Sequence, residues 1–259
     1  MDPYAWSLNP EAFVVLVLTG VYLASLRLHP ASAWRVSCYL AAMALLLGVT
    51  VTPVHALAMH YLLTMHLLQN VVLAEWAPLL VVLGVAPGLA AALAGAGVVR
   101  AFTHPAVALP LWIANYMVWH LPWVYDAALE NPNSLLHLEH VAYFATGVAM
   151  WWCVFQDEPH RLGSGARAAY VFAAFVFASP IGLVMALVPS PLYDFYVHAH
   201  RRVWGLSPLE DQQLAGMLMA LEQAAVFFAV FAFWFFRFLA EEERRGEHAD
   251  DVDRPPAPA

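Results

Sequence analysis

The stretch QLAGMLMALEQAAVFFAVFAFWFFR, residues 213 to 237, decides the fold class of this chain. Its only ionisable side chains are Glu222 and the final Arg237. A helix that spans a bilayer needs roughly 20 mostly apolar residues. The alternation of polar and apolar residues that is typical of barrel strands is absent. We therefore predict that this stretch crosses a membrane as a helix.

Six further apolar runs precede this stretch and use most of the chain. Hydrophobic residues make up 62% of the sequence and charged residues 12%, with a mean hydropathy of +0.65, which excludes a water-soluble fold. We predict an all-α integral membrane protein with seven transmembrane helices in one domain, residues 1 to 240. The six runs are residues 11 to 28, 34 to 54, 57 to 83, 106 to 125, 137 to 156 and 167 to 188.

The arginines predict the orientation of this domain, because the sequence contains no lysine. Nine arginines fall on one side of a seven-helix arrangement, whereas Arg201 and Arg202 fall on the other. The positive-inside rule then puts the N-terminus outside, in the periplasm, and the C-terminus in the cytoplasm. The Ala/Gly-rich residues 86 to 99 are short for a crossing, and we leave open an interfacial helix, a re-entrant loop or an eighth span.

The last residues, 241 to 259, differ sharply from the rest. They read EEERRGEHADDVDRPPAPA, with many charges, three prolines and no apolar face. Such a composition predicts a disordered acidic tail, which lies on the cytoplasmic side in the predicted orientation. Part of the net charge of −8 comes from this tail, and no basic surface indicates a nucleic-acid partner. The expected surroundings are those of a lipid bilayer.

Histidines gather at the predicted outer ends of several helices. Ionisable groups inside spans are costly and usually face the bundle interior, so they are the first place to look for function. His137 and His140 are three residues apart and share a helix face, with Glu139 pointing elsewhere. The cluster also includes His198 or His200, and its members on the predicted helices are His55, His60, His66, His120, His137 and His140.

The spacing in the third and fourth runs gives more detail. His55, Met59, His66 and Asn70 form one stripe of a continuous helix, with His66 reaching deepest. In the fourth run, Pro122 should kink the helix just after His120.

The start of the last run adds a carboxylate and two thioethers to the predicted histidine cluster. Asp211 stands there, followed by Met217 and Met219. Imidazole with thioether suits copper, particularly Cu(I). Neither an HExxH, a CxxC nor a glycine-rich phosphate loop occurs in the sequence. A single histidine is more often an interfacial hydrogen-bonding residue than a ligand, and methionines more often pack than bind, so the prediction depends on the cluster as a whole.

Two acidic residues fall within the predicted spans. Glu222 lies two to three turns inside the last helix, and Glu75 lies near the inner end of the third. Each is compatible with a proton relay and with a hydrogen-bonded carboxyl between helices. We expect Glu222 to be the deeper of the two.

The order of several short motifs resembles a known family. The motifs are MHLL (65 to 68), APLLVVLG (77 to 84), HP (104 to 105), WHLP (119 to 122), LHLEH (136 to 140) and DQQLAGMLM (211 to 219). Between about His60 and Phe235 the chain is similar to the multi-span CtaG-like cytochrome c oxidase assembly proteins. The resemblance implies a multi-pass protein of the bacterial inner (plasma) membrane that helps to mature a haem–copper oxidase.

The same resemblance implies that the protein is not an enzyme but handles copper on the periplasmic side. Its expected partners are cytochrome c oxidase subunits or a periplasmic copper chaperone. The family pattern expects a second histidine one turn after His66, where this chain has Asn70, and His60 or Met59 could compensate. The predicted metal-site residues are His60, His66, His120, His137, His140, Asp211 and Met219.

Three other functions compete with copper handling. A haem-binding electron carrier needs two facing histidines, which His66 and His120 could supply. A membrane metal hydrolase would use the histidines with Asp211, but little in the sequence favours it. A retinal protein is excluded, because its Schiff base requires a lysine.

Overall fold

The computed structural model describes residues 2–199 and 201–252, and every regular element within them is helical. This confirms the all-α prediction. The elements are α1 (Pro10–Ser25), α2 (Ala33–Val51), α3 (Pro53–His60), α4 (Leu63–Val71), the π-helical turn η1 (Val72–Trp76), α5 (Ala77–Gly84), α6 (Pro87–Ala94), α7 (Gly97–Phe102), α8 (Pro105–Trp119), α9 (Pro122–Glu130), α10 (Leu135–Phe155), α11 (Ser164–Leu187), α12 (Asp194–Val197) and α13 (Pro208–Val252).

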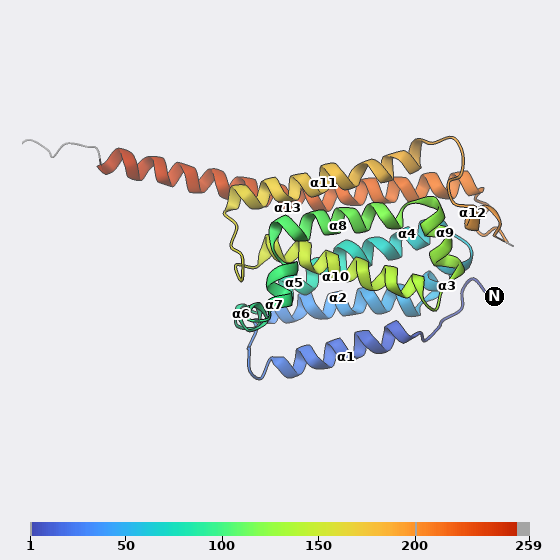
Figure 1. Ribbon diagram of the computed structural model, residues 1–259, viewed down its shortest axis with the longest axis horizontal. Coiled ribbons are helices and arrows are strands. Elements are labelled where there is room, and N and C mark those ends of the chain that lie inside the picture. The colour runs from blue at the N-terminus through green and yellow to red at the C-terminus, as the bar shows by residue number, and fades with distance from the viewer. Residues whose placement is uncertain (1, 200, 253–259) are drawn as a thin grey trace, which may run out of the picture.

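The long elements run along a common axis, and the short ones lie at its two ends (Figure 1). Along the axis run α1, α2, the α4–η1–α5 rod, α8, α10, α11 and α13. Helices α3, α9 and α12 lie at one end, which we call the histidine end. Helices α6 and α7 lie at the opposite end, beyond which α13 projects.

Four stretches of the described chain are long and apolar enough to cross a membrane. They are Ala33–Val51, Leu63–Gly84, Ser164–Leu187 and Pro208–Glu247. Pro10–Ser25 and Pro105–Trp119 are apolar but shorter. Membrane-spanning helices are thus supported by length and composition.

Two of the predicted runs are interrupted in the structure. Helix α3 ends at His60 and α4 begins at Leu63, so the prediction of one continuous stripe from His55 to Asn70 was wrong. The fourth run also breaks, because α8 ends at Trp119 and Pro122 starts α9 with its missing N–H at a position that needs none. Both interruptions lie at the histidine end (Figure 1).

The Ala/Gly-rich residues 86 to 99 form α6 and the first half of α7. Helix α6 has eight residues and so extends about 12 Å, far less than the roughly 30 Å hydrocarbon layer. Gly95 and Ala96 separate it from α7.

The C-terminal helix continues past the last predicted span. Helix α13 extends to Val252, so residues 241 to 252 of the predicted tail are helical in the structure. Residues 253 to 259 lie outside the described residues. The division into a membrane domain and a disordered tail therefore stays a prediction.

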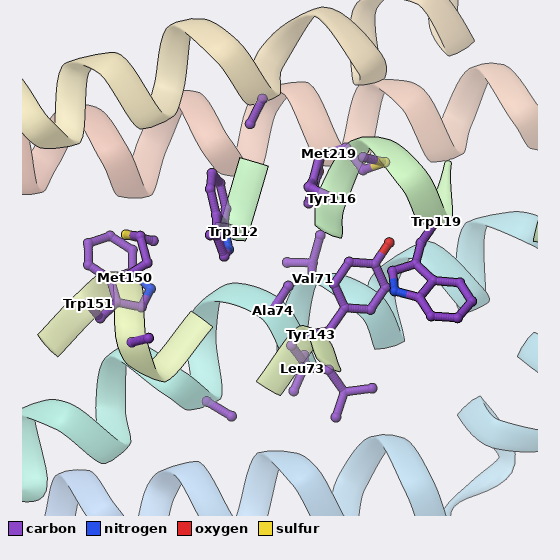
Figure 2. Close-up of a cluster of buried hydrophobic side chains, with 14 of the residues drawn as sticks. Val71, Leu73, Ala74, Trp112, Tyr116, Trp119, Tyr143, Met150, Trp151 and Met219 are labelled. Atoms are coloured by element: carbon purple, nitrogen blue, oxygen red, sulfur yellow. The ribbon is translucent and has the colours of Figure 1, made fainter. Parts of the chain in front are cut away.

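The core is rich in aromatic side chains. Figure 2 shows Trp112, Met150 and Trp151 in one part of it, and Tyr116, Trp119 and Tyr143 in another. Phe227 of α13 packs against the rings of Trp112 and Trp151, with centroids 5.8 and 5.2 Å away. These rings connect α8, α10 and α13.

Glycines allow the backbones to approach closely in the same core. A Cβ atom on Gly147 of α10 would lie 2.2 Å from the carbonyl oxygen of Ala74 in η1. A Cβ atom on Gly216 of α13 would lie 2.6 Å from the carbonyl oxygen of Gly182 in α11. Small residues are the usual means of close helix packing in membranes.

We expect Gly147→Ala to lower the free energy of unfolding by about 1 to 3 kcal/mol, because α10 must move away from η1. Gly20→Ala is the matched control, since no atom lies within 4 Å of its added Cβ and alanine favours the helix. Thermal unfolding in detergent measures both variants. Equal stability of the two variants would contradict the close contact.

Candidate functional site

The histidine end contains a cavity of about 550 Å³. His55, Met59 and His60 of α3 line it, together with Glu11 of α1 and His137 of α10. A neighbouring cavity of about 750 Å³ shares His60 with it and is also lined by His198. Imidazole and thioether groups thus line a space large enough for a small ligand. His200 lies outside the described residues.

The α3 histidines lie outside the membrane-length helices. Burial lowers the pKa of His55 to about 4, and burial also lowers the pKa of His60. Both imidazoles are therefore neutral at pH 7. A neutral imidazole has the lone pair that a metal ion requires.

Glu11 holds two histidines with one carboxylate oxygen. His137 and His140 each direct Nδ1 toward Oε1 of Glu11, at 2.9 and 2.6 Å. A carboxylate oxygen only accepts hydrogen bonds, so both Nδ1 atoms carry hydrogen. The two imidazoles from α10 are therefore adjacent, and α1 orients them.

His66 of α4 is fully buried, as its predicted depth requires. Its Nδ1 lies 3.0 Å from the hydroxyl of Tyr196, which itself donates to the carbonyl of Ala58 at 2.6 Å. Tyr196 has a single hydroxyl hydrogen, so Nδ1 of His66 must be the donor in the first bond. Nε2 of His66 lies 3.8 Å from Oε1 of Glu139.

His120 ends α8 and is 8% exposed. Its Nδ1 donates to the carbonyl oxygen of Tyr116 at 2.8 Å. The ring of Tyr125 contacts both this imidazole and that of His66, with centroids 6.3 Å from the first and 5.0 Å from the second. The break that Pro122 makes in the fourth run brings Tyr125 to this place, because α9 begins there.

All four of these histidines therefore carry hydrogen on Nδ1, so in the neutral imidazole the lone pair lies on Nε2. Among the described residues, the Nε2 atoms of His66, His120 and His140 are buried without a hydrogen-bond partner. Histidines that bind metals usually show this arrangement, in which a carboxylate or carbonyl fixes one nitrogen and leaves the other for the ion. In residues 2–199 and 201–252, however, no three His, Cys, Asp or Glu side chains are grouped to hold one ion.

Asp211 accepts hydrogen bonds from the first residues of α4. Its Oδ2 accepts from the backbone N–H of Leu63 at 2.7 Å, and its Oδ1 accepts from the N–H of Thr64 at 3.0 Å and from its hydroxyl at 2.7 Å. Leu62, at the N-cap position of α4, makes no side-chain cap. Asp211 of α13 thus caps α4 from another helix.

We expect Asp211→Ala to lower the free energy of unfolding by about 1 to 3 kcal/mol, because the first amides of α4 lose their buried acceptor. Asp194→Ala is the control, since Asp194 is exposed. Thermal unfolding of the purified variants measures the difference. Unchanged stability of Asp211→Ala would show that the cap contributes little.

The two methionines of α13 differ in exposure. Met219 is 1% exposed and packs where α13 crosses α11, with its Cβ 3.2 Å from the position of a Cβ on Gly182. Figure 2 shows it beside Tyr116 among apolar side chains. Met217 is 46% exposed. Met59 is the methionine that lines the cavity with histidines.

Sequence reasoning missed Glu11, Glu139 and Tyr125. Glu139 is 1% exposed, and its Oε1 accepts from Asn70 Nδ2 at 3.0 Å. One sequence signal could have revealed it, because the apolar Leu138 and Val141 share a helix face that suits lipid, which leaves Glu139 on a different face of α10. In the structure both apolar side chains are exposed. The position of Glu11 depends on how α1 packs, which no local pattern contains.

Comparison with protein families places the chain in a known family. The family model described as cytochrome c oxidase caa3 assembly factor (Caa3_CtaG) matches residues 15–241. Neither a curated protein nor a solved structure matches the chain.

Proposed function

The chain belongs to the cytochrome c oxidase caa3 assembly factor family, and on that premise we propose that it binds Cu(I) at the histidine end and passes it to an oxidase subunit. Copper is cargo in this proposal, and the protein has no catalytic step. Cytochrome c oxidase subunits and a periplasmic copper chaperone are the proposed partners.

The observation that carries the proposal is the protonation pattern of the imidazoles. His66, His120 and His140 each use Nδ1 as a donor, and each has a buried, unpartnered Nε2. An unpaired acceptor in an apolar interior costs free energy, and a soft cation would satisfy it. Neutral His55 and His60, with Met59 beside them in the cavity, suit the same ion.

Incomplete coordination favours transfer over storage. Cu(I) accepts as few as two soft or imidazole ligands, and the histidines occur in two pairs. His137 and His140 both contact Glu11. His66 and His120 both contact the ring of Tyr125. We propose that the ion enters through the cavity to the first pair and moves inward to the second.

We place the histidine end in the periplasm and propose that seven helices cross the inner membrane. Support comes from the arginines, four of which, Arg161, Arg167, Arg237 and Arg245, gather around one cavity. Arg35 donates to the carbonyl oxygens of Leu83 and Val85, next to α6. The positive-inside rule assigns such an end to the cytoplasm.

We expect the purified protein to bind about one Cu(I) under anaerobic, reducing conditions. Glu11→Gln should weaken this binding about 10- to 100-fold, because the two histidines of α10 lose the carboxylate that orients them. Glu130→Gln is the control, since Glu130 lines the same cavity. Competition with a Cu(I) chelator measures the affinities.

Equal affinities of the two Glu variants would contradict the proposed site. A Soret band after haem-replete expression would favour the haem carrier, with His66 and His120 as axial ligands.

In cells that lack this protein, we expect the copper content and activity of the caa3-type oxidase to fall. The wild-type chain should restore both, and a His66→Ala, His120→Ala double variant should not, because both inner Nε2 atoms are lost. His160→Ala is the control, since His160 is only partly buried and its Nε2 contacts the carbonyl oxygen of Arg100 at the opposite end of the molecule. Full restoration by the double variant at equal membrane abundance would overturn the copper role and leave assembly through protein contacts.

A further inference from the structure

Two acidic side chains lie together in the core, separate from the histidines. Glu75 in η1 is fully buried, and Glu222 in α13 is 9% exposed. Glu75 is thus the more buried side chain, and the greater depth of Glu222 along its span stays a prediction. Two hydrogen bonds bring the carboxyl groups together: Trp76, the neighbour of Glu75, donates to Glu222, and Gln223, the neighbour of Glu222, donates to Glu75.

Neutral hydrogen-bond donors surround this pair. The Nε2 atom of Gln223 donates to Oε1 of Glu75 at 2.9 Å and to the hydroxyl of Tyr116 at 2.7 Å. The indole of Trp76 donates to Oε1 of Glu222 at 2.5 Å. Within the described residues, neither carboxyl forms a salt bridge, so no cationic side chain balances them.

The cluster has more acceptors than donors. Oε2 of Glu75, Oε2 of Glu222 and Oε1 of Gln223 are all buried and have no hydrogen-bond partner in the part of the chain that the structure describes. Both hydrogens of the Gln223 amide are already used. Each buried acceptor without a donor is destabilising, so these atoms require hydrogens that Gln223 and Trp76 do not supply.

The backbone at this place is also unusual. Glu75 and Trp76 belong to the π-helical turn between α4 and α5. Such turns are rare and often occur at functional sites. The indole of Trp151 donates to the carbonyl of Glu75 at 3.0 Å, which holds this turn against α10.

Two neighbouring carboxylates cannot both remain charged in an apolar interior without a counter-ion. We propose that Glu75 and Glu222, with Gln223, form a proton-binding site that holds at least one proton between the two carboxyls at neutral pH. The bound proton supplies the missing donor. The other titratable groups that face the site are the hydroxyls of Tyr116 on α8 and Tyr143 on α10.

Infrared spectroscopy of the purified full-length protein at neutral pH tests this proposal. We expect a carboxylic acid C=O band that shifts in D₂O and is diminished or lost in both Glu75→Gln and Glu222→Gln. Glutamine has the shape of a protonated carboxyl, so at least one variant should fold. Glu243→Gln is the control, because Glu243 is exposed and its removal should alter only ionised-carboxylate bands.

Two results would overturn the proposal. In the first, both variants differ from the wild type only in carboxylate bands, which means that both acids are ionised. In the second, the carboxylic acid band is absent in sodium buffer and grows when choline replaces sodium, which means that a metal cation occupies the site. Neither result depends on copper binding, so the test is independent of the proposed function.

Discussion

The cap that Asp211 places on α4 is the interaction on which the histidine end depends. A helix that starts inside a bundle exposes backbone N–H groups, and a lipid environment offers no water to satisfy them. Asp211 supplies the acceptor for Leu63 and Thr64, and it comes from a helix more than 140 positions away in the chain. The break at Tyr61 and Leu62 is thereby stabilised. His66 lies within the first turn of α4, so its depth and direction depend on this contact.

The break also separates two environments for histidine. Helix α3 carries His55 and His60 beside a cavity, whereas α4 carries His66 into the core. Each buried imidazole in the core is fixed through Nδ1 by a different type of acceptor: a tyrosine hydroxyl for His66, a backbone carbonyl for His120 and a carboxylate for His140. Three unrelated contacts thus produce one chemical result, an unpaired Nε2.

The sequence predicted the features that follow from composition, motif order and helical periodicity. Apolar runs correctly indicated an all-helical membrane protein, the motif order indicated its family, and the offset of three between His137 and His140 indicated neighbours, which both contact Glu11. It did not predict the break after His60, because the capping residue lies in another helix. It missed Glu11 and the pairing of Glu75 with Glu222 for the same reason. Such positions depend on how helices pack, and no local pattern records that.

The π-helical turn has a consequence for changes in chain length. An α-helix rotates by about 100° per residue, and a π turn absorbs one residue without rotating the helix on its C-terminal side. The π turn at Val72–Trp76 therefore lets α4 direct its buried face to the core while α5 directs its own face to α2. Removing one residue from this segment would convert the π turn into an α-helical turn and leave both faces against their partners, whereas removing one residue from within α4 or α5 would rotate one face away from its partner. A one-residue deletion should consequently be tolerated better within Val72–Trp76 than within either of these two helices.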